Sequence, residues 1–152
     1  MKQLIAFLAF VCVAAGGLAE STPTVIFVCE KGSVKSVLAA AQFNRLAQHK
    51  NLAFTAVPRG LRADEVVPEK LLQSMRADGL EAGLTSSRKL TPEEAKRAVV
   101  VVSMCDLPAE FGKDTRVESW PDIPPVSVDY TKARDVLAAQ IEKLTATLTA
   151  KP

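Results

Sequence analysis

One cysteine stands at the end of a short apolar run, where a polar loop turns into a helix. Residues 25–28 predict a buried strand, and residues 36–46 predict an amphipathic helix that begins near Ser36. The loop between them, from Cys29 to Lys35, directs several backbone N–H groups to one spot beside the helix N-terminus, which favours an anion. The same field favours a thiolate at Cys29. The pattern therefore predicts a nucleophile beside an oxyanion site, which is chemistry suited to phosphoryl or arsenyl transfer.

The segment from Cys29 to Ser36 resembles the active-site loop of the low-molecular-weight protein tyrosine phosphatases and of the arsenate reductases that share their fold. Those proteins carry a Cys, five loop residues, an Arg and a Ser; Cys29 and Ser36 match this pattern, but Lys35 stands at the Arg position. The resemblance implies that Cys29 attacks phosphorus, that Ser36 stabilises the thiolate and that Lys35 holds oxyanions. The remaining loop residues, which the resemblance implies in oxyanion binding, are Glu30, Lys31, Gly32, Ser33 and Val34. A Lys ammonium lacks the planar fork of a guanidinium, so the exchange keeps the charge but alters the grip on a transition state.

A second polar residue stands in a stiff loop further along the chain. Residues 120–125 read Trp-Pro-Asp-Ile-Pro-Pro, and their three prolines restrict the backbone. In the family, an Asp on a Pro-containing loop in this region protonates the leaving group and later activates water, so the resemblance implies this role for Asp122. The alternative is a solvated turn residue, because Ile123 separates Asp122 from the next proline. Trp120 either lines the substrate mouth or closes the core, and closing the core is the commoner fate of a single Trp.

Cys105 offers a second thiol. The resemblance places its strand beside the active-site region, where some arsenate reductases use a cysteine to resolve a covalent intermediate, so Cys105 is a candidate redox partner of Cys29. A buried structural thiol and a Cys29–Cys105 disulfide are the alternatives, because sequence spacing does not decide whether two Cα atoms lie within bridging distance.

Three arginines elsewhere in the chain are candidates to replace the guanidinium that is absent at position 35. They are Arg59, Arg62 and Arg88. We expect them to be solvated, and any one of them could supply the planar donor pair that Lys35 lacks.

Strand-like and helix-like segments alternate along the rest of the chain with short connections, which is typical of a parallel sheet covered on both faces. With the resemblance, which extends over residues 23–149, this predicts one α/β domain: a three-layer sandwich in which a short four-stranded parallel sheet carries helices on both faces. The predicted elements beyond the first helix are a strand at 54–57 closed by a turn at 58–60, a helix from Val66 to Met75 ended by Gly79, a helix capped by Thr91 and Glu94, a buried strand at 98–104 and a helix at 130–148.

The N-terminus predicts export. An apolar run follows Lys2 and ends with Gly17 and Ala19, small residues at the positions that a signal peptidase reads. We therefore divide the chain into a signal peptide, 1–19, and a phosphatase-like domain, 20–152, which is periplasmic or secreted and has no stable membrane association after cleavage. An uncleaved anchor or a buried helix is the alternative for the apolar run.

Composition narrows the cofactors and partners. The formal net charge is only +2, without a basic run or an aromatic platform, which argues against nucleic acid. One His and two cysteines outside the predicted signal are too few for a transition-metal cluster, and no organic cofactor is implied. The resemblance implies a phosphorylated protein or a small oxyanion, phosphate or arsenate, as partner. The predicted function is hydrolysis of phosphate monoesters through Cys29; the alternatives are a catalytically weak or inactive oxyanion-binding module and a thiol-dependent arsenate reductase.

Overall fold

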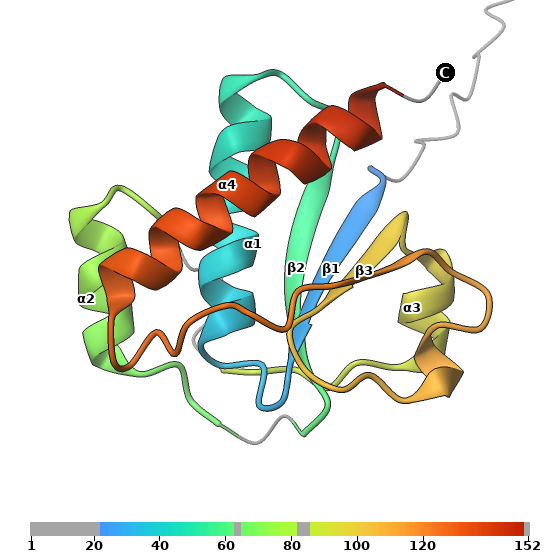
Figure 1. The fold of residues 1–152 in the computed structure, drawn as a ribbon, viewed down its shortest axis with the longest axis horizontal. Coiled ribbons are helices and arrows are strands. Elements are labelled where there is room, and N and C mark those ends of the chain that lie inside the picture. Colours follow the sequence, from blue (N-terminus) through green and yellow to red (C-terminus); the bar gives the residue numbers. More distant parts are fainter. Residues whose placement is uncertain (1–21, 63–64, 82–85, 151–152) are drawn as a thin grey trace, which may run out of the picture.

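A parallel four-stranded sheet forms the centre of the domain (Figure 1). The computed structural model describes residues 22–62, 65–81 and 86–150, and the predicted signal peptide lies outside them. The sheet has the order β2-β1-β3-β4, and all neighbouring strands are parallel. The strands are β1 (Thr24–Cys29), β2 (Thr55–Gly60), β3 (Val100–Ser103) and β4 (Val117–Ser119).

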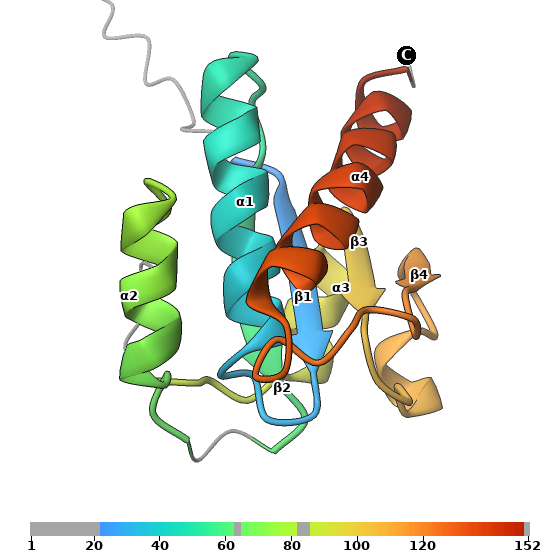
Figure 2. The same cartoon turned by 60° about the vertical axis from the view of Figure 1, so that its left-hand side comes forward.

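Helices cover both faces of the sheet (Figures 1 and 2). One face carries α1 (Lys35–His49), α2 (Glu69–Ala77) and α4 (Tyr130–Thr149); the other carries α3 (Pro92–Arg97) and the short 3-10 helix η1 (Ala109–Phe111). The predicted three-layer α/β architecture is therefore confirmed. Within the described ranges, no helix is both long enough and apolar enough to cross a membrane.

The central strand β1 contributes to a core on each face of the sheet. Val25 and Phe27 belong to the core under α1 and α4, whereas Ile26 and Val28 belong to the core under α3. Side chains alternate along a strand, so a slip by one residue would exchange the two sets. This double burial sets the register of β1 and thereby the position of Cys29, which ends the strand.

Two predicted boundaries are wrong. The sequence predicts a turn at 58–60, but these residues continue β2 and pair with the end of β1. Because β2 is an edge strand, it tolerates the missing N–H of Pro58. The helix predicted from Val66 begins instead at Glu69, and the Val66 side chain is 74% exposed.

Two predicted helix signals are confirmed. Thr91 caps α3, because its hydroxyl accepts from the backbone N–H of Glu94 at 3.2 Å while the Glu94 carboxylate accepts from the N–H of Thr91 at 3.3 Å. Gly79 follows α2 with a φ of +68°, the left-handed conformation that ends many helices. Both signals are local, which is why the sequence pattern sufficed.

Candidate active site

Cys29 ends β1 and faces the first turn of α1. Its Sγ is hydrogen bonded to Ser36 Oγ at 3.3 Å, and both residues are buried. The register of the strand places the thiol, and the start of the helix places the hydroxyl. A hydroxyl in this position can donate to a thiolate and stabilise its charge. The two predicted residues are therefore in direct contact.

The backbone of the intervening loop is suited to an anion. Among the described residues, no group accepts a hydrogen bond from the backbone N–H groups of residues 30–37. Val34 occupies the N-cap of α1 without a side-chain hydrogen bond, and the first turn of the helix holds no acidic residue. An uncapped helix N-terminus attracts negative charge through its N–H groups and its dipole.

Two glycines allow this loop to lie against the end of β2. Gly32 has a φ of +71°, and a Cβ on it would lie 2.5 Å from the backbone nitrogen of Gly60. A Cβ on Gly60 would lie 2.6 Å from the backbone carbonyl carbon of Lys31. No side-chain rotation relieves contacts with backbone atoms, so both positions require glycine. The N–H of Leu61 donates to the carbonyl of Cys29 at 3.2 Å and extends the contact between the two segments.

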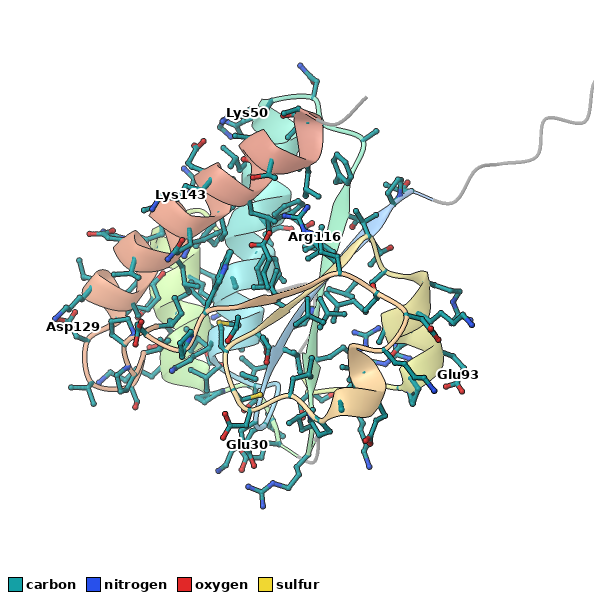
Figure 3. All side chains as sticks on the ribbon, turned by 45° about the vertical axis from the view of Figure 1, so that its right-hand side comes forward. Glu30, Lys50, Glu93, Arg116, Asp129 and Lys143 are labelled. Atoms are coloured by element: carbon teal, nitrogen blue, oxygen red, sulfur yellow. The ribbon has the colours of Figure 1, made fainter. Side chains whose placement is uncertain are left out.

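Charged residues at the rim of the loop pair with one another. Glu30, at the lower end of the molecule in Figure 3, forms an ion pair with Arg62, and Lys31 Nζ lies 2.7 Å from Glu65 Oε1. The buried hydroxyl of Ser33 donates to Glu65 Oε2 at 3.3 Å. The hydrogen bond from Lys31 lowers the pKa of Glu65, and the Ser33 hydroxyl adds to the effect. The two pairs cancel, so these four charges give the site no net charge.

Lys35, the first residue of α1, reaches a different loop. Its Nζ donates to the backbone carbonyl of Ile123 at 2.6 Å. The cation implied in oxyanion binding is therefore attached to the loop that carries Asp122. An ammonium has three donors, so this contact leaves two for a ligand.

Asp122 lies at the surface in a loop that two buried side chains, Trp120 and Ile123, attach to the core. Trp120 and Ile123 are 7% and 4% exposed, and the Trp120 ring lies 5.7 Å from the ring of Phe27 between centroids. The expectation that Trp120 closes the core is confirmed. The Asp122 side chain is exposed, and it forms no hydrogen bond or ion pair with any residue in the described part of the chain. Its carboxylate is therefore open to solvent.

Cys105 lies beside the strand end that carries Cys29. Val28 pairs with Ser103, and the N–H of Met104 donates to the carbonyl of Val28 at 2.9 Å, so the chains run together up to the two cysteines. Burial raises the pKa of the Cys105 thiol, and charge on Cys29 adds to this effect. Both thiols are free in the structure.

Arg59 is buried, so the expectation that it is solvated is wrong. Its guanidinium donates to both carboxylate oxygens of Glu94 at 2.8 to 3.2 Å and to the carbonyl of Pro58 at 2.7 Å. These charge-assisted hydrogen bonds lower the pKa of Glu94 and attach α3 to the end of β2. Since Arg62 pairs with Glu30, both arginines are already engaged.

Sequence reasoning missed two partners of the loop. Glu65 binds Lys31 and Ser33, and the carbonyl of Ile123 binds Lys35. Glu65 lies in an irregular segment without a motif, and a backbone carbonyl carries no residue-type signal at all. Within residues 22–62, 65–81 and 86–150, no three His, Cys, Asp or Glu side chains are grouped so that they could hold a metal ion.

The sequence also matches a known family. The model of the family described as low molecular weight phosphotyrosine protein phosphatase matches residues 24–116. The chain belongs to this family. The match includes the strand, loop and helix from β1 to α1, whereas Asp122 lies outside it. No curated protein sequence matches this member of the family.

Solved structures share the phosphatase fold at low sequence identity. YfkJ from Bacillus subtilis has a TM-score of 0.72 at 16% identity, over 87% of this chain and 98% of that chain. An arsenate reductase in the phosphate-binding state has a TM-score of 0.66 at 24% identity, over 82% and 98%. YwlE arginine phosphatase from Bacillus subtilis, in a mutant form with a phosphorylated active-site serine, has a TM-score of 0.69 at 18% identity, over 83% and 95%. At these identities the similarity shows the fold alone.

Proposed function

We propose that this protein hydrolyses phosphate monoesters with Cys29 as the nucleophile. The observation that carries the proposal is the 3.3 Å contact between Cys29 Sγ and Ser36 Oγ, at a loop whose N–H groups have no acceptor among the described residues. Family membership supports the reaction class. In the YwlE mutant, the active-site serine is covalently phosphorylated. The corresponding covalent intermediate of this protein would be a phosphocysteine at Cys29.

In the first step the Cys29 thiolate attacks phosphorus. The S–P bond forms while the ester P–O bond breaks, and Asp122, as a carboxylic acid, gives its proton to the leaving oxygen. Lys35 and the loop N–H groups bind the other phosphoryl oxygens and stabilise their charge in the transition state.

In the second step a water molecule attacks phosphorus. Asp122, now a carboxylate, accepts the proton of the water, the S–P bond breaks and inorganic phosphate leaves. The Cys29 thiolate is restored, and the hydroxyl of Ser36 donates to it. Asp122 is again a carboxylic acid, so the site returns to its starting state without a cofactor or a change of oxidation state.

Hydrolysis of p-nitrophenyl phosphate by the reduced protein tests the proposal. Cys29→Ser should lower turnover by about 10³-fold or more, because the nucleophile is lost. Cys105→Ser removes the other thiol of the domain and should keep turnover. If the parent protein binds phosphate but does not turn over, the chain is a catalytically weak or inactive oxyanion-binding module instead.

The substrate we propose is a phosphorylated protein, with small oxyanions such as phosphate and arsenate as competing ligands. The paired rim charges favour neither acidic nor basic sequences around the phosphorylated residue. Turnover of phosphotyrosine and phosphoarginine peptides, measured side by side, would separate the activity in the family's description from the activity named for YwlE.

The neighbouring position of Cys105 favours arsenate reduction as a second candidate function. In that reaction Cys29 attacks arsenate with loss of water, and the Cys105 thiolate then attacks Cys29 Sγ. Arsenite leaves, As(V) becomes As(III), and the two thiols become a disulfide that an external thiol must reduce. Arsenate-dependent consumption of a thiol donor, lost in Cys105→Ser while phosphate ester hydrolysis persists, would support this activity.

We further propose that the protein is exported and cleaved after Ala19, on the basis of the N-terminal sequence pattern. N-terminal sequencing of the protein from the periplasmic fraction of a bacterial host tests this. A chain that starts at Glu20 would support export, and an intact N-terminus in the cytoplasmic fraction would contradict it.

A further inference from the structure

Lys35 connects the nucleophile loop with the loop of Asp122. The two partners of its hydrogen bond, Lys35 Nζ and the carbonyl oxygen of Ile123, belong to residues 88 positions apart in the chain. Both ends of the contact are anchored, because Lys35 begins α1 and the Ile123 side chain is buried in the same core as Trp120. A bond between anchored groups restrains the backbone effectively, since little conformational freedom remains to be lost when it forms.

The carbonyl that accepts this bond belongs to the residue after Asp122, in the peptide between Ile123 and Pro124. On the other side of Asp122, the N–H of Trp120 donates to the carbonyl of Ser103 at 2.7 Å. The Asp122 carboxylate itself has no partner among the described residues. Its position therefore depends on these two backbone anchors and on the buried side chains beside it.

We propose that Lys35 is a positioning residue for Asp122, which by holding the Ile123 carbonyl sets the distance between the general acid and a substrate at Cys29. This inference rests on the proposed function and adds a task to Lys35 beyond charge. The compact ammonium can hold the carbonyl with one donor and direct the other two toward substrate oxygens. The guanidinium that the family carries at this position donates with both arms of its planar fork to two oxygens of one ligand. A Lys at this position thus binds oxyanions and also holds the loop that carries Asp122.

The dependence on the leaving group separates these two tasks. Phenyl phosphate needs a proton on its leaving oxygen far more than p-nitrophenyl phosphate does, so only the former depends strongly on the general acid. Lys35→Met keeps the aliphatic stem and removes the donor. It should lower kcat/KM, which reports the step that releases the leaving group, about tenfold more for phenyl phosphate than for p-nitrophenyl phosphate, as partial loss of general acid catalysis predicts. In an Asp122→Asn background this extra loss should vanish, because no acid remains to be positioned.

Lys31→Met is the matched control. It removes the same charge from the same loop, but Lys31 pairs with Glu65 and has no bond to Ile123. It should affect both substrates in the same proportion. If Lys35→Met also lowers both in the same proportion, Lys35 acts on the oxyanion alone and the proposal is overturned.

Fluorescence of Trp120 tests the contact without turnover, because this residue is the only tryptophan of the chain. In the reduced, ligand-free protein, Lys35→Met should raise the acrylamide quenching constant of Trp120, and Lys31→Met should leave it unchanged. Circular dichroism establishes that both variants are folded. A parent protein without turnover would refute the proposed function. Independently of that result, an unchanged quenching constant in Lys35→Met would refute the proposal that Lys35 restrains the loop that carries Asp122.

Discussion

The two loops of the site are held in place by different means. The nucleophile loop is fixed mainly by backbone contacts: it follows a doubly buried strand, and Gly32 lies against the backbone of Gly60, while Lys31 and Ser33 add side-chain bonds to Glu65. The loop at 120–125 has one backbone hydrogen bond to the sheet, from the N–H of Trp120 to the carbonyl of Ser103, and is otherwise fixed by side chains, namely two buried residues and the ammonium of Lys35. A loop that is fixed by its backbone tolerates most changes of residue type, but it does not tolerate a Cβ added at a glycine that contacts another backbone. Side-chain fixation depends on each participating residue, so substitutions should damage the two loops in different ways.

The largest expected effect comes from Gly32→Ala. The new Cβ would meet backbone atoms of β2 at a positive φ, so we expect about 3 kcal/mol of destabilisation and loss of vanadate binding. Gly79→Ala is the matched control, because Gly79 has nearly the same φ but only a side-chain atom 3.9 Å away. It should cost about 1 kcal/mol, from strain alone. Urea unfolding and vanadate titration measure both; equal costs would mean that the contact with Gly60 is unimportant.

Glu94→Gln tests the support beneath the nucleophile loop. It leaves the buried guanidinium of Arg59 without its counter-charge, so the free energy of unfolding should fall by about 2–3 kcal/mol. Arg59 lowers the pKa of Glu94 in the folded state below its ordinary value of 4.5. The pair therefore stabilises the fold fully at pH values above 4.5, and this contribution is lost as the pH falls through the lowered pKa of the folded state. Unfolding measured from pH 7 to pH 3 should therefore show a shallower acid-side decline in the variant.

The control for this substitution is Glu69→Gln, which breaks an exposed pair with Arg76. Exposed pairs contribute little, so its unfolding at pH 7 should match that of the parent. A similar loss in both variants would contradict a special role for the buried pair.

Asp122→Asn tests whether the second loop carries the general acid. We expect kcat/KM for phenyl phosphate to fall about 100-fold and kcat/KM for p-nitrophenyl phosphate to fall much less, because kcat/KM reports the step in which the leaving oxygen takes its proton. Urea unfolding should be unchanged, because the carboxylate is exposed. Unchanged turnover of both substrates would show that Asp122 is a solvated turn residue, and the second loop would then have no catalytic part.

The smallest expected effect is that of Glu65→Gln. Removing this carboxylate frees the charge of Lys31 beside the loop, so phosphate should bind about two- to fivefold more tightly at low salt, as for an exposed ion pair, and the gain should shrink as salt screens it. Glu142→Gln, which breaks an exposed pair with Lys50 elsewhere, should leave phosphate affinity unchanged. Calorimetric titration at two salt concentrations measures this; weaker binding would mean that Glu65 mainly orders the loop through Ser33.

The accuracy of the sequence predictions depended on distance along the chain. The strand, the loop and the helix around Cys29 were predictable because hydrophobic period and helix-start signals are local, and the capping box at Thr91 was predictable for the same reason. The turn predicted at 58–60 was wrong because Pro58 reads as a strand breaker unless the strand is known to lie at an edge. Burial of Arg59 could not be foreseen, since it requires the partner Glu94, which lies 35 positions away.

The sequence by itself determined the chemistry at the start of the domain: a strand that must be buried on both faces, a helix that must begin near Ser36, and a Cys and a Lys at the two ends of the connection. Only the tertiary structure decided what surrounds them, including the contact of Lys35 with the carbonyl of Ile123 and the pairing of Lys31 with Glu65. The physical reason is that period and capping follow from neighbouring residues, whereas any donor can bind any carbonyl or carboxylate that the packing of the sheet and its helices brings within reach.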